Sequence, residues 1–182
     1  MWKDLFSSFY EDRGIVFIRN LLLNNKSMAL KTGALQAQLQ ELKEYLPKKE
    51  LTNPKVSSAA VGWHISHILQ VINNIFDSLK NSDPEDFKRD FSFWKTAVFM
   101  FRKIPRGKAR SPKVVLPPDD IEMEFLQQQM EEAQANILLI NNFPKKAHFA
   151  HPFFNHLNRN ETKKFLEIHT EHHLKIIRDI LK

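Results

Sequence analysis

The segment that decides the fold is residues 160–180, with the sequence NETKKFLEIHTEHHLKIIRDI. Its apolar residues recur at intervals of three and four, which is the period of an α-helix. The residues that share one side of this helix are Phe165, His169, His173, Ile176 and Ile180. Because an apolar face of this kind is normally buried against other helices, the pattern predicts a long C-terminal helix with two histidines turned toward the core.

Three upstream segments repeat the helical period, at residues 28–46, 57–80 and 119–142. We expect Ser57 and Ser58 to cap the second of these helices, because serine side chains accept hydrogen bonds from free backbone N–H groups. Asp119 and Asp120 are expected to cap the third in the same way. With only four glycines in the chain, helices are favoured over strands throughout.

Four long amphipathic helices predict an all-α fold, a four-helix bundle with a long connection between the second and third helices. Within that connection we expect an accessory helix, and we interpret its aromatic series as packing. The residues that define it are Phe87, Phe91, Trp94, Val98 and Phe101. Residues 1–27 have no clean period, so we interpret them as an N-terminal extension and residues 28–182 as the bundle domain.

The absence of cysteine and the position of the basic residues exclude or disfavour several kinds of site. The chain has no cysteine, so any metal must be held by histidine, carboxylate or amide ligands. The net charge of +6 is concentrated in one segment without acids, which contains Arg102, Lys103, Arg106, Lys108, Arg110 and Lys113. A neutral body with one basic loop, in which no aromatic residues interleave, does not favour nucleic-acid binding. The apolar stretch nearest the N-terminus is too short and too polar to span a membrane, so we expect a cytoplasmic protein without a membrane partner.

Histidines give the strongest chemical signal. His169 and His173 lie one helical turn apart and face the same way, so the pair can hold one metal ion. The helix at 57–80 adds His64 and His67, and three neutral imidazoles with one vacant position are typical of catalytic zinc sites. Periodicity does not choose between the latter two: His64 lies nearer the middle of the apolar stripe and His67 lies at its edge. His172 stays open as an alternative to His173.

Three stretches resemble one known family: AVGWHISHI at residues 60–68, HPFF at 151–154 and HTEHHL at 169–174. Together they are similar to the DinB/YfiT-like metalloenzyme superfamily, most closely to its HPxFG branch, over roughly residues 28–182. The resemblance implies that His67, His169 and His173 bind one divalent metal, most simply zinc or nickel. Two positions depart from the family pattern. Its tryptophan corresponds to Ala59, with Trp63 one turn later, and its loop glycine corresponds to Asn155.

The same resemblance implies a metal-dependent enzyme with a small-molecule substrate, since relatives transfer low-molecular-weight thiols or isomerise substrates with a thiol cofactor. It also implies pairing of two chains as a homodimer. The anionic groups of a thiol cosubstrate would then be received by the basic loop, through Arg102, Arg106, Lys108 and Arg110. We consider His151 as a fourth ligand, a proton shuttle or a loop anchor, and favour the anchor. The alternative function is a non-catalytic metal-binding or interaction bundle.

Overall fold

The computed structural model describes residues 33–107, 115–117 and 121–182. The chain divides into two compact units, Met1–Gly33 and Ala34–Lys182, and the fold described below is that of the second unit. The N-terminal extension expected at residues 1–27 lies outside the described residues. So do Lys108 and Arg110 of the basic loop and the caps expected at Asp119 and Asp120.

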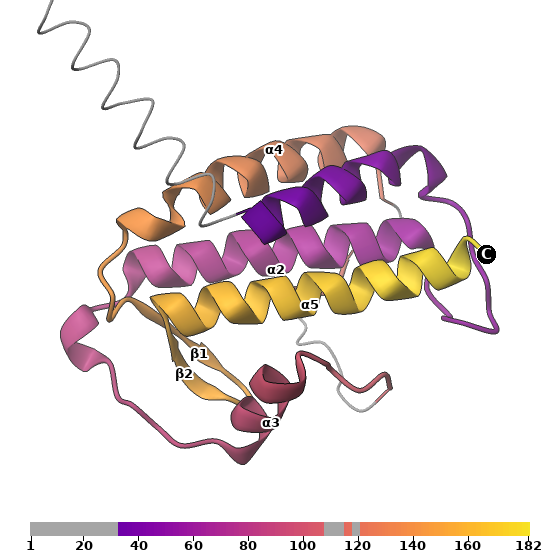
Figure 1. Cartoon of the computed structure of the whole chain (residues 1–182). Coiled ribbons are helices and arrows are strands. Elements are labelled where there is room, and N and C mark those ends of the chain that lie inside the picture. The colour runs from indigo at the N-terminus through magenta and orange to yellow at the C-terminus, as the bar shows by residue number, and fades with distance from the viewer. Residues whose placement is uncertain (1–32, 108–114, 118–120) are drawn as a thin grey trace, which may run out of the picture. The chain divides into compact units, whose positions relative to one another are not determined.

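The described chain is mostly helical and contains one small two-stranded sheet (Figure 1). Its helices are residues 33–44, α2 (Val61–Asn81), α3 (Phe93–Phe101), α4 (Met123–Leu139) and α5 (Arg159–Ile180), with short 3-10 helices η1 (Leu46–Lys48), η2 (Pro84–Asp86) and η4 (Ile140–Asn142). Strands β1 (His148–His151) and β2 (Asn155–Asn158) pair antiparallel. The expected helical class is confirmed at this coarse level, and the small β1–β2 hairpin is a feature that the all-α prediction did not include.

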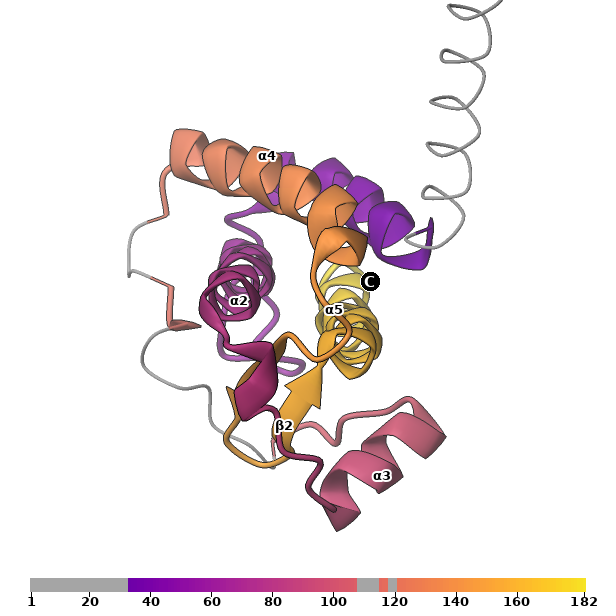
Figure 2. The same ribbon diagram turned by 90° about the vertical axis from the view of Figure 1, so that its left-hand side faces the viewer.

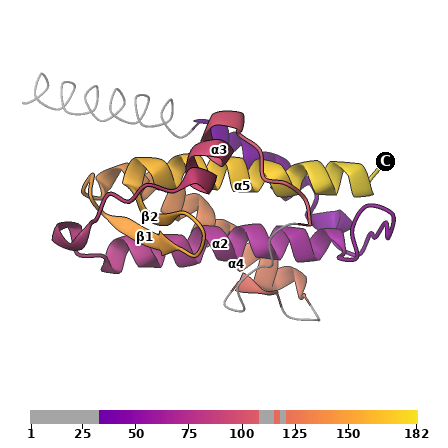
Figure 3. The same ribbon diagram turned by 90° about the horizontal axis from the view of Figure 1, so that it is seen from below.

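Helices α2 and α5 run side by side, and other elements cover the two sides of this pair. Helix α4 and residues 33–44 lie on one side (Figures 1 and 2). The hairpin contacts both α2 and α5 on the other side, and α3 contacts α5 there (Figure 3). The largest fully buried side chains are Leu39, Leu42, Ile65, Ile68, Leu69, Ile72, Leu79, Leu126, Ile137, Ile140, Leu157 and Leu166. Each such side chain contributes about 1.5–3 kcal/mol when it leaves water, so this core holds the paired helices in place.

The starts of α2 and α5 show how local chemistry sets the helix ends. The predicted serine cap of α2 is wrong: the helix begins after Ala60, and the hydroxyl of Ser57 instead accepts the N–H of Ala59. Helix α5 begins with a capping box. The Asn158 side chain accepts the N–H of Glu161, and the Glu161 carboxylate accepts the N–H of Asn158. Two backbone donors are satisfied reciprocally, which fixes where α5 starts.

Helix α3 is shorter than predicted and faces the other way. It begins only after Ser92, whose hydroxyl accepts the N–H of Lys95. The side chain that it turns inward at this point is Lys95, which is 9% exposed and pairs with Glu161 at the start of α5. Of the aromatic series only Val98 is buried; the exposed members are Phe91, Trp94 and Phe101. The structure therefore excludes packing of these three in the core, where a lysine anchors the helix instead, and their packing against a second chain stays a prediction.

A partly buried polar cluster joins α2 to α4. Asn73 is 6% exposed, and its amide donates to the Glu132 carboxylate at 3.2 Å and to the Gln129 carbonyl at 3.2 Å. Asn136 donates to the Asn73 side-chain oxygen at 3.1 Å. Satisfied buried polar groups of this kind fix the register of two packed helices, since a shifted register would leave them without partners. Across the described ranges, no helix combines the length and apolar character that a membrane crossing requires.

Candidate metal centre

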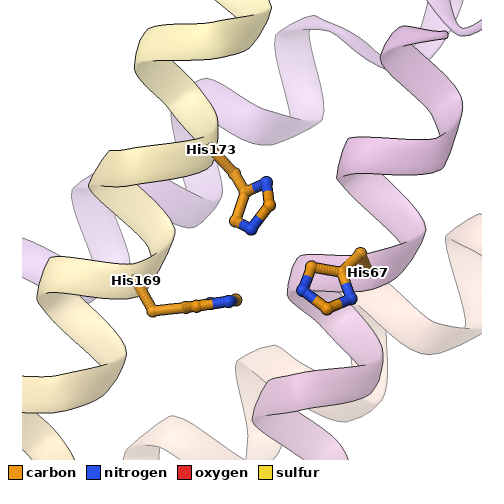
Figure 4. Close-up of side chains that lie close together, drawn as sticks. All are labelled: His67, His169 and His173. Carbon is orange, nitrogen blue, oxygen red and sulfur yellow. The ribbon is translucent and has the colours of Figure 1, made fainter. Parts of the chain in front are cut away.

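Three histidines from two helices turn toward one another (Figure 4). One nitrogen from each of His67, His169 and His173 can be chosen so that all three atoms lie within 4.8 Å of one another. The ring centroid of His67 lies 5.2 Å from that of His169 and 4.8 Å from that of His173. Among residues 33–107, 115–117 and 121–182, this is the one cluster of three histidine or carboxylate side chains close enough to hold a metal ion.

The spacing of the histidines along α5 explains where their side chains lie. His169 and His173 lie four residues apart on the side of α5 that packs against α2, so both point toward the neighbouring helix. His67 and His173 are buried, at 3% and 8% exposed, and His169 is half-buried. The cluster therefore lies mainly in the protein interior.

A backbone carbonyl sets the tautomer of His67. Its Nδ1 lies 2.8 Å from the carbonyl oxygen of Val115. Since a carbonyl oxygen only accepts hydrogen bonds, Nδ1 carries the proton and donates it. The lone pair of the neutral ring is then on Nε2, which leaves that atom free to bind a metal. Ligating histidines usually have such a partner on their other ring nitrogen.

His64 is not a member of the cluster but contacts one of its members, His173. Its Nδ1 is 3.0 Å from Nδ1 of His173, and its Nε2 is 3.0 Å from the hydroxyl of Ser57. Both ring nitrogens of His64 are thus engaged by protein groups. Of the two histidines that periodicity left open on this helix, the structure brings His67 together with His169 and His173.

Burial keeps these imidazoles neutral. It is the largest cause that lowers the pKa of His169 and His173 well below the ordinary 6.5, and neighbouring histidines add to it. Burial also lowers the pKa of His67, although the hydrogen bond to Val115 acts in the opposite direction. The pKa of His64 falls to about 4 for the same main reason. Neutral imidazoles keep a lone pair at neutral pH, and this is the form that binds metal ions.

One nitrogen of the cluster has no partner among the described residues. Nδ1 of His169 is buried and makes no hydrogen bond there. Buried polar atoms are rarely left in this state, and a bound cation is one of the ordinary explanations. Three neutral imidazoles without a thiolate suit a divalent first-row ion such as zinc or nickel. The residues present therefore fit a metal of this class.

Trp63 covers one side of the cluster, a role that the sequence reading missed. Its ring stacks on that of His67, with centroids 5.1 Å apart and planes 17° apart. The signal was present in the sequence, because Trp63 and His67 are four residues apart on one helix. A stacked indole restricts the rotation of His67 and excludes water from that side.

His172 lies outside the cluster and fastens another segment. Its ring meets that of His173 edge to face, with centroids 5.0 Å apart. A hydrogen bond to the backbone of Ile104 raises its pKa, while burial and the charge of Arg106 lower it more strongly. The side chain thus ties the chain after α3 to α5, and His172 does not replace His173 in the cluster.

His151 acts as the anchor of the hairpin turn. Its Nδ1 accepts the N–H groups of Phe153 and Phe154 at 3.1 and 3.2 Å. Its ring stacks on Phe154 at 4.2 Å and meets Phe165 of α5 edge to face at 4.8 Å. Asn155 has φ +59°, a left-handed conformation that asparagine adopts more readily than most non-glycine residues.

This anchor leads to a prediction about acid stability. Burial lowers the pKa of His151 to about 4, so between pH 7 and 4 the unfolded chain binds a proton there more readily than the folded one. Folding stability must therefore fall as the pH falls, by at most about 3 kcal/mol from this group. His151→Asn keeps an acceptor for the two N–H groups but does not titrate. Urea unfolding at pH 7 and pH 4 should show a smaller loss for the variant; equal losses would contradict the prediction.

The basic residues expected to receive a cosubstrate lie beside α5 where the structure describes them. Arg102 pairs with Glu167 at 3.2 Å and Arg106 with Asp179 at 2.8 Å, and all four side chains are partly exposed. The positive charge of Arg106 also lowers the pKa of His64 and His172, so this guanidinium acts on the surroundings of the cluster.

The cluster and its supports come from widely separated parts of the chain. His67 and Val115 are 48 residues apart, and His64 and His173 are 109 apart. No local sequence signal identifies Val115 as the partner of His67, because this contact forms only when the chain has folded. Comparisons with protein-family models, with curated proteins and with solved structures found no match to this chain.

Proposed function

We propose that the chain is a metal-dependent enzyme that holds one divalent ion, zinc or nickel, with His67, His169 and His173. The observation that carries the proposal is the meeting of three neutral imidazoles from two helices, with ligand atoms within 4.8 Å of one another. Three histidines leave coordination positions for a substrate or water, which is typical of catalytic rather than structural sites.

The proposed architecture is a four-helix bundle of the DinB/YfiT-like type. Its members would be residues 33–44, α2, α4 and α5, with α3 in the long connection between α2 and α4. The contacts of α2 with both α4 and α5 support this arrangement. We also propose that the chain belongs to the DinB/YfiT-like superfamily and that it is cytoplasmic.

The residues around the cluster limit the chemistry. A divalent ion there would act as a Lewis acid that makes a bound water or thiol a better nucleophile at neutral pH. The two carboxylates beside the ligands on α5, within the described part of the chain, are already engaged in ion pairs: Glu167 pairs with Arg102, and Glu171 pairs with Arg178. We propose as cosubstrate the low-molecular-weight thiol that the family resemblance implies. Arg106, which pairs with Asp179 and whose charge acts on His64 and His172, would exchange that partner for an anionic group of the thiol.

Cobalt substitution tests this function. The protein loaded with Co²⁺ should give a visible spectrum, and a small thiol such as glutathione should add a sulfur-to-cobalt charge-transfer band. The matched control is Arg106→Gln, which should bind cobalt normally but require several-fold more of an anionic thiol. If cobalt binds and no thiol changes the spectrum, the thiol-dependent function is wrong.

A second candidate is a non-catalytic interaction bundle, favoured by the outer face of α3. That face exposes Phe93, Trp94, Met100 and Phe101, each by 63–71%. Contiguous apolar surface of this kind marks contacts with other molecules. A homodimer formed there is compatible with either function, and the mass in solution of a Trp94→Ser variant would show whether this face pairs two chains.

A further inference from the structure

A chain of hydrogen bonds leads from the metal cluster to the start of α2. Nδ1 of His173 lies 3.0 Å from Nδ1 of His64, and Nε2 of His64 lies 3.0 Å from the hydroxyl oxygen of Ser57. The same hydroxyl oxygen accepts the N–H of Ala59 at 3.1 Å. His64 is 4% exposed and His173 8%, so water competes little for these bonds.

Each contact in this chain needs one donor and one acceptor, which allows two arrangements of protons. In the first, His173 donates from Nδ1 to His64, and His64 donates from Nε2 to Ser57. Nε2 of His173 then has a free lone pair. In the second, Ser57 donates to Nε2 of His64, and His64 donates from Nδ1 to His173. Nε2 of His173 then carries a proton and cannot bind a metal through that atom.

Only the first arrangement is compatible with coordination through Nε2 of His173. The Ser57 hydroxyl allows it, because that oxygen accepts Ala59 N–H with one lone pair and can accept a second N–H with the other. Coordination and the proton positions in the chain are therefore coupled. A substitution of His64 should therefore change the affinity for the metal, although His64 is not a ligand.

We propose that His64 and Ser57 are positioning residues of the metal centre, which hold His173 in the tautomer and orientation that present Nε2 to the ion. This inference rests on the proposed function, since it presupposes that His173 is a ligand. His64 does for His173 what the Val115 carbonyl does for His67. Outer partners of this kind typically contribute about 10- to 100-fold to metal affinity.

The test measures zinc affinity of the full chain by competition with a chromophoric chelator. His64→Phe fills the space of the imidazole but accepts no hydrogen bond, and we expect it to weaken zinc binding about 10- to 100-fold. His64→Asn keeps an acceptor near the position of Nδ1 and should bind within a few-fold of the original protein. Ser57→Ala should fall between the two, because it removes only the last acceptor of the chain.

A second measurement does not depend on any variant folding. In the zinc-loaded protein, two-bond ¹H–¹⁵N correlation spectra report which ring nitrogen of each histidine carries the proton. We expect the proton on Nδ1 of His173 and on Nε2 of His64. The opposite positions would overturn the inference, as would a folded His64→Phe variant with unchanged zinc affinity.

Failure of this inference can be told apart from failure of the proposed function. If His67→Ala abolishes zinc binding while His64→Phe leaves it unchanged, the metal centre stands and the positioning role of His64 is wrong. If His67→Ala also binds zinc as tightly as the original protein, the metal centre itself is wrong, and the positioning role falls with it.

Discussion

Replacing His67 by alanine is expected to reduce the metal content of the purified protein from about one ion per chain to background. His67 is the sole ligand that α2 contributes to the cluster, so the variant leaves two imidazoles on one helix. Loss of an outer partner alone costs up to about 100-fold in affinity, and loss of a ligand should exceed that. Elemental analysis after dialysis against metal-free buffer makes the measurement.

A matched control separates this effect from a general one. His148→Ala also removes a histidine, but His148 lies in β1, is not part of the cluster, and bonds to the backbone of Lys146. Its metal content should equal that of the original protein. Equal metal content in His67→Ala and His148→Ala would contradict the ligand assignment.

Removing the metal is expected to lower the stability of the folded chain strongly. The folded state brings the three imidazoles together in neutral form, while the unfolded chain does not, so a metal binds the folded state preferentially. At a free zinc concentration between 100 and 1,000 times Kd, this linkage stabilises the fold by about 3–4 kcal/mol. For a chain of this length that corresponds to a rise in Tm of roughly 10 °C. Thermal unfolding with and without a chelator measures the difference.

His169→Ala is the control for this second prediction. It removes a ligand whose Nδ1 makes no hydrogen bond among the described residues, so the truncation leaves no protein group without a hydrogen-bond partner at that atom. Zinc should raise the Tm of this variant by no more than a degree or two. A rise as large as in the original protein would mean that zinc stabilises the chain from somewhere other than the three-histidine cluster.

The pair on α5 could be predicted from sequence because a spacing of four residues fixes two side chains on one helix face. The choice between His64 and His67 could not. Both are buried, at 4% and 3% exposed, and both belong to the same side of α2. What distinguishes them is the position of α5 and of Val115, and neither follows from the pattern of α2 itself.

The hairpin and the buried side of α3 could not be predicted, for different reasons. Strands of four residues are too short for an alternating pattern to stand out, and the turn between them depends on the His151 side chain and on the positive φ of Asn155. For α3, the aromatic spacing indicated a helix correctly but gave the wrong buried side. The ion pair between Lys95 and Glu161 orients it, and this contact joins residues 66 positions apart.

The central claim is that imidazoles from α2 and α5 bind one metal ion together. X-ray absorption spectroscopy at the metal edge, on protein loaded with one equivalent of zinc, tests it most directly. We expect three imidazole nitrogens at about 2.0–2.1 Å, with at least one further light-atom ligand from solvent. The His67→Ala sample should show at most two imidazoles. A spectrum of the original protein without imidazole scattering, or one unchanged in His67→Ala, would contradict the claim.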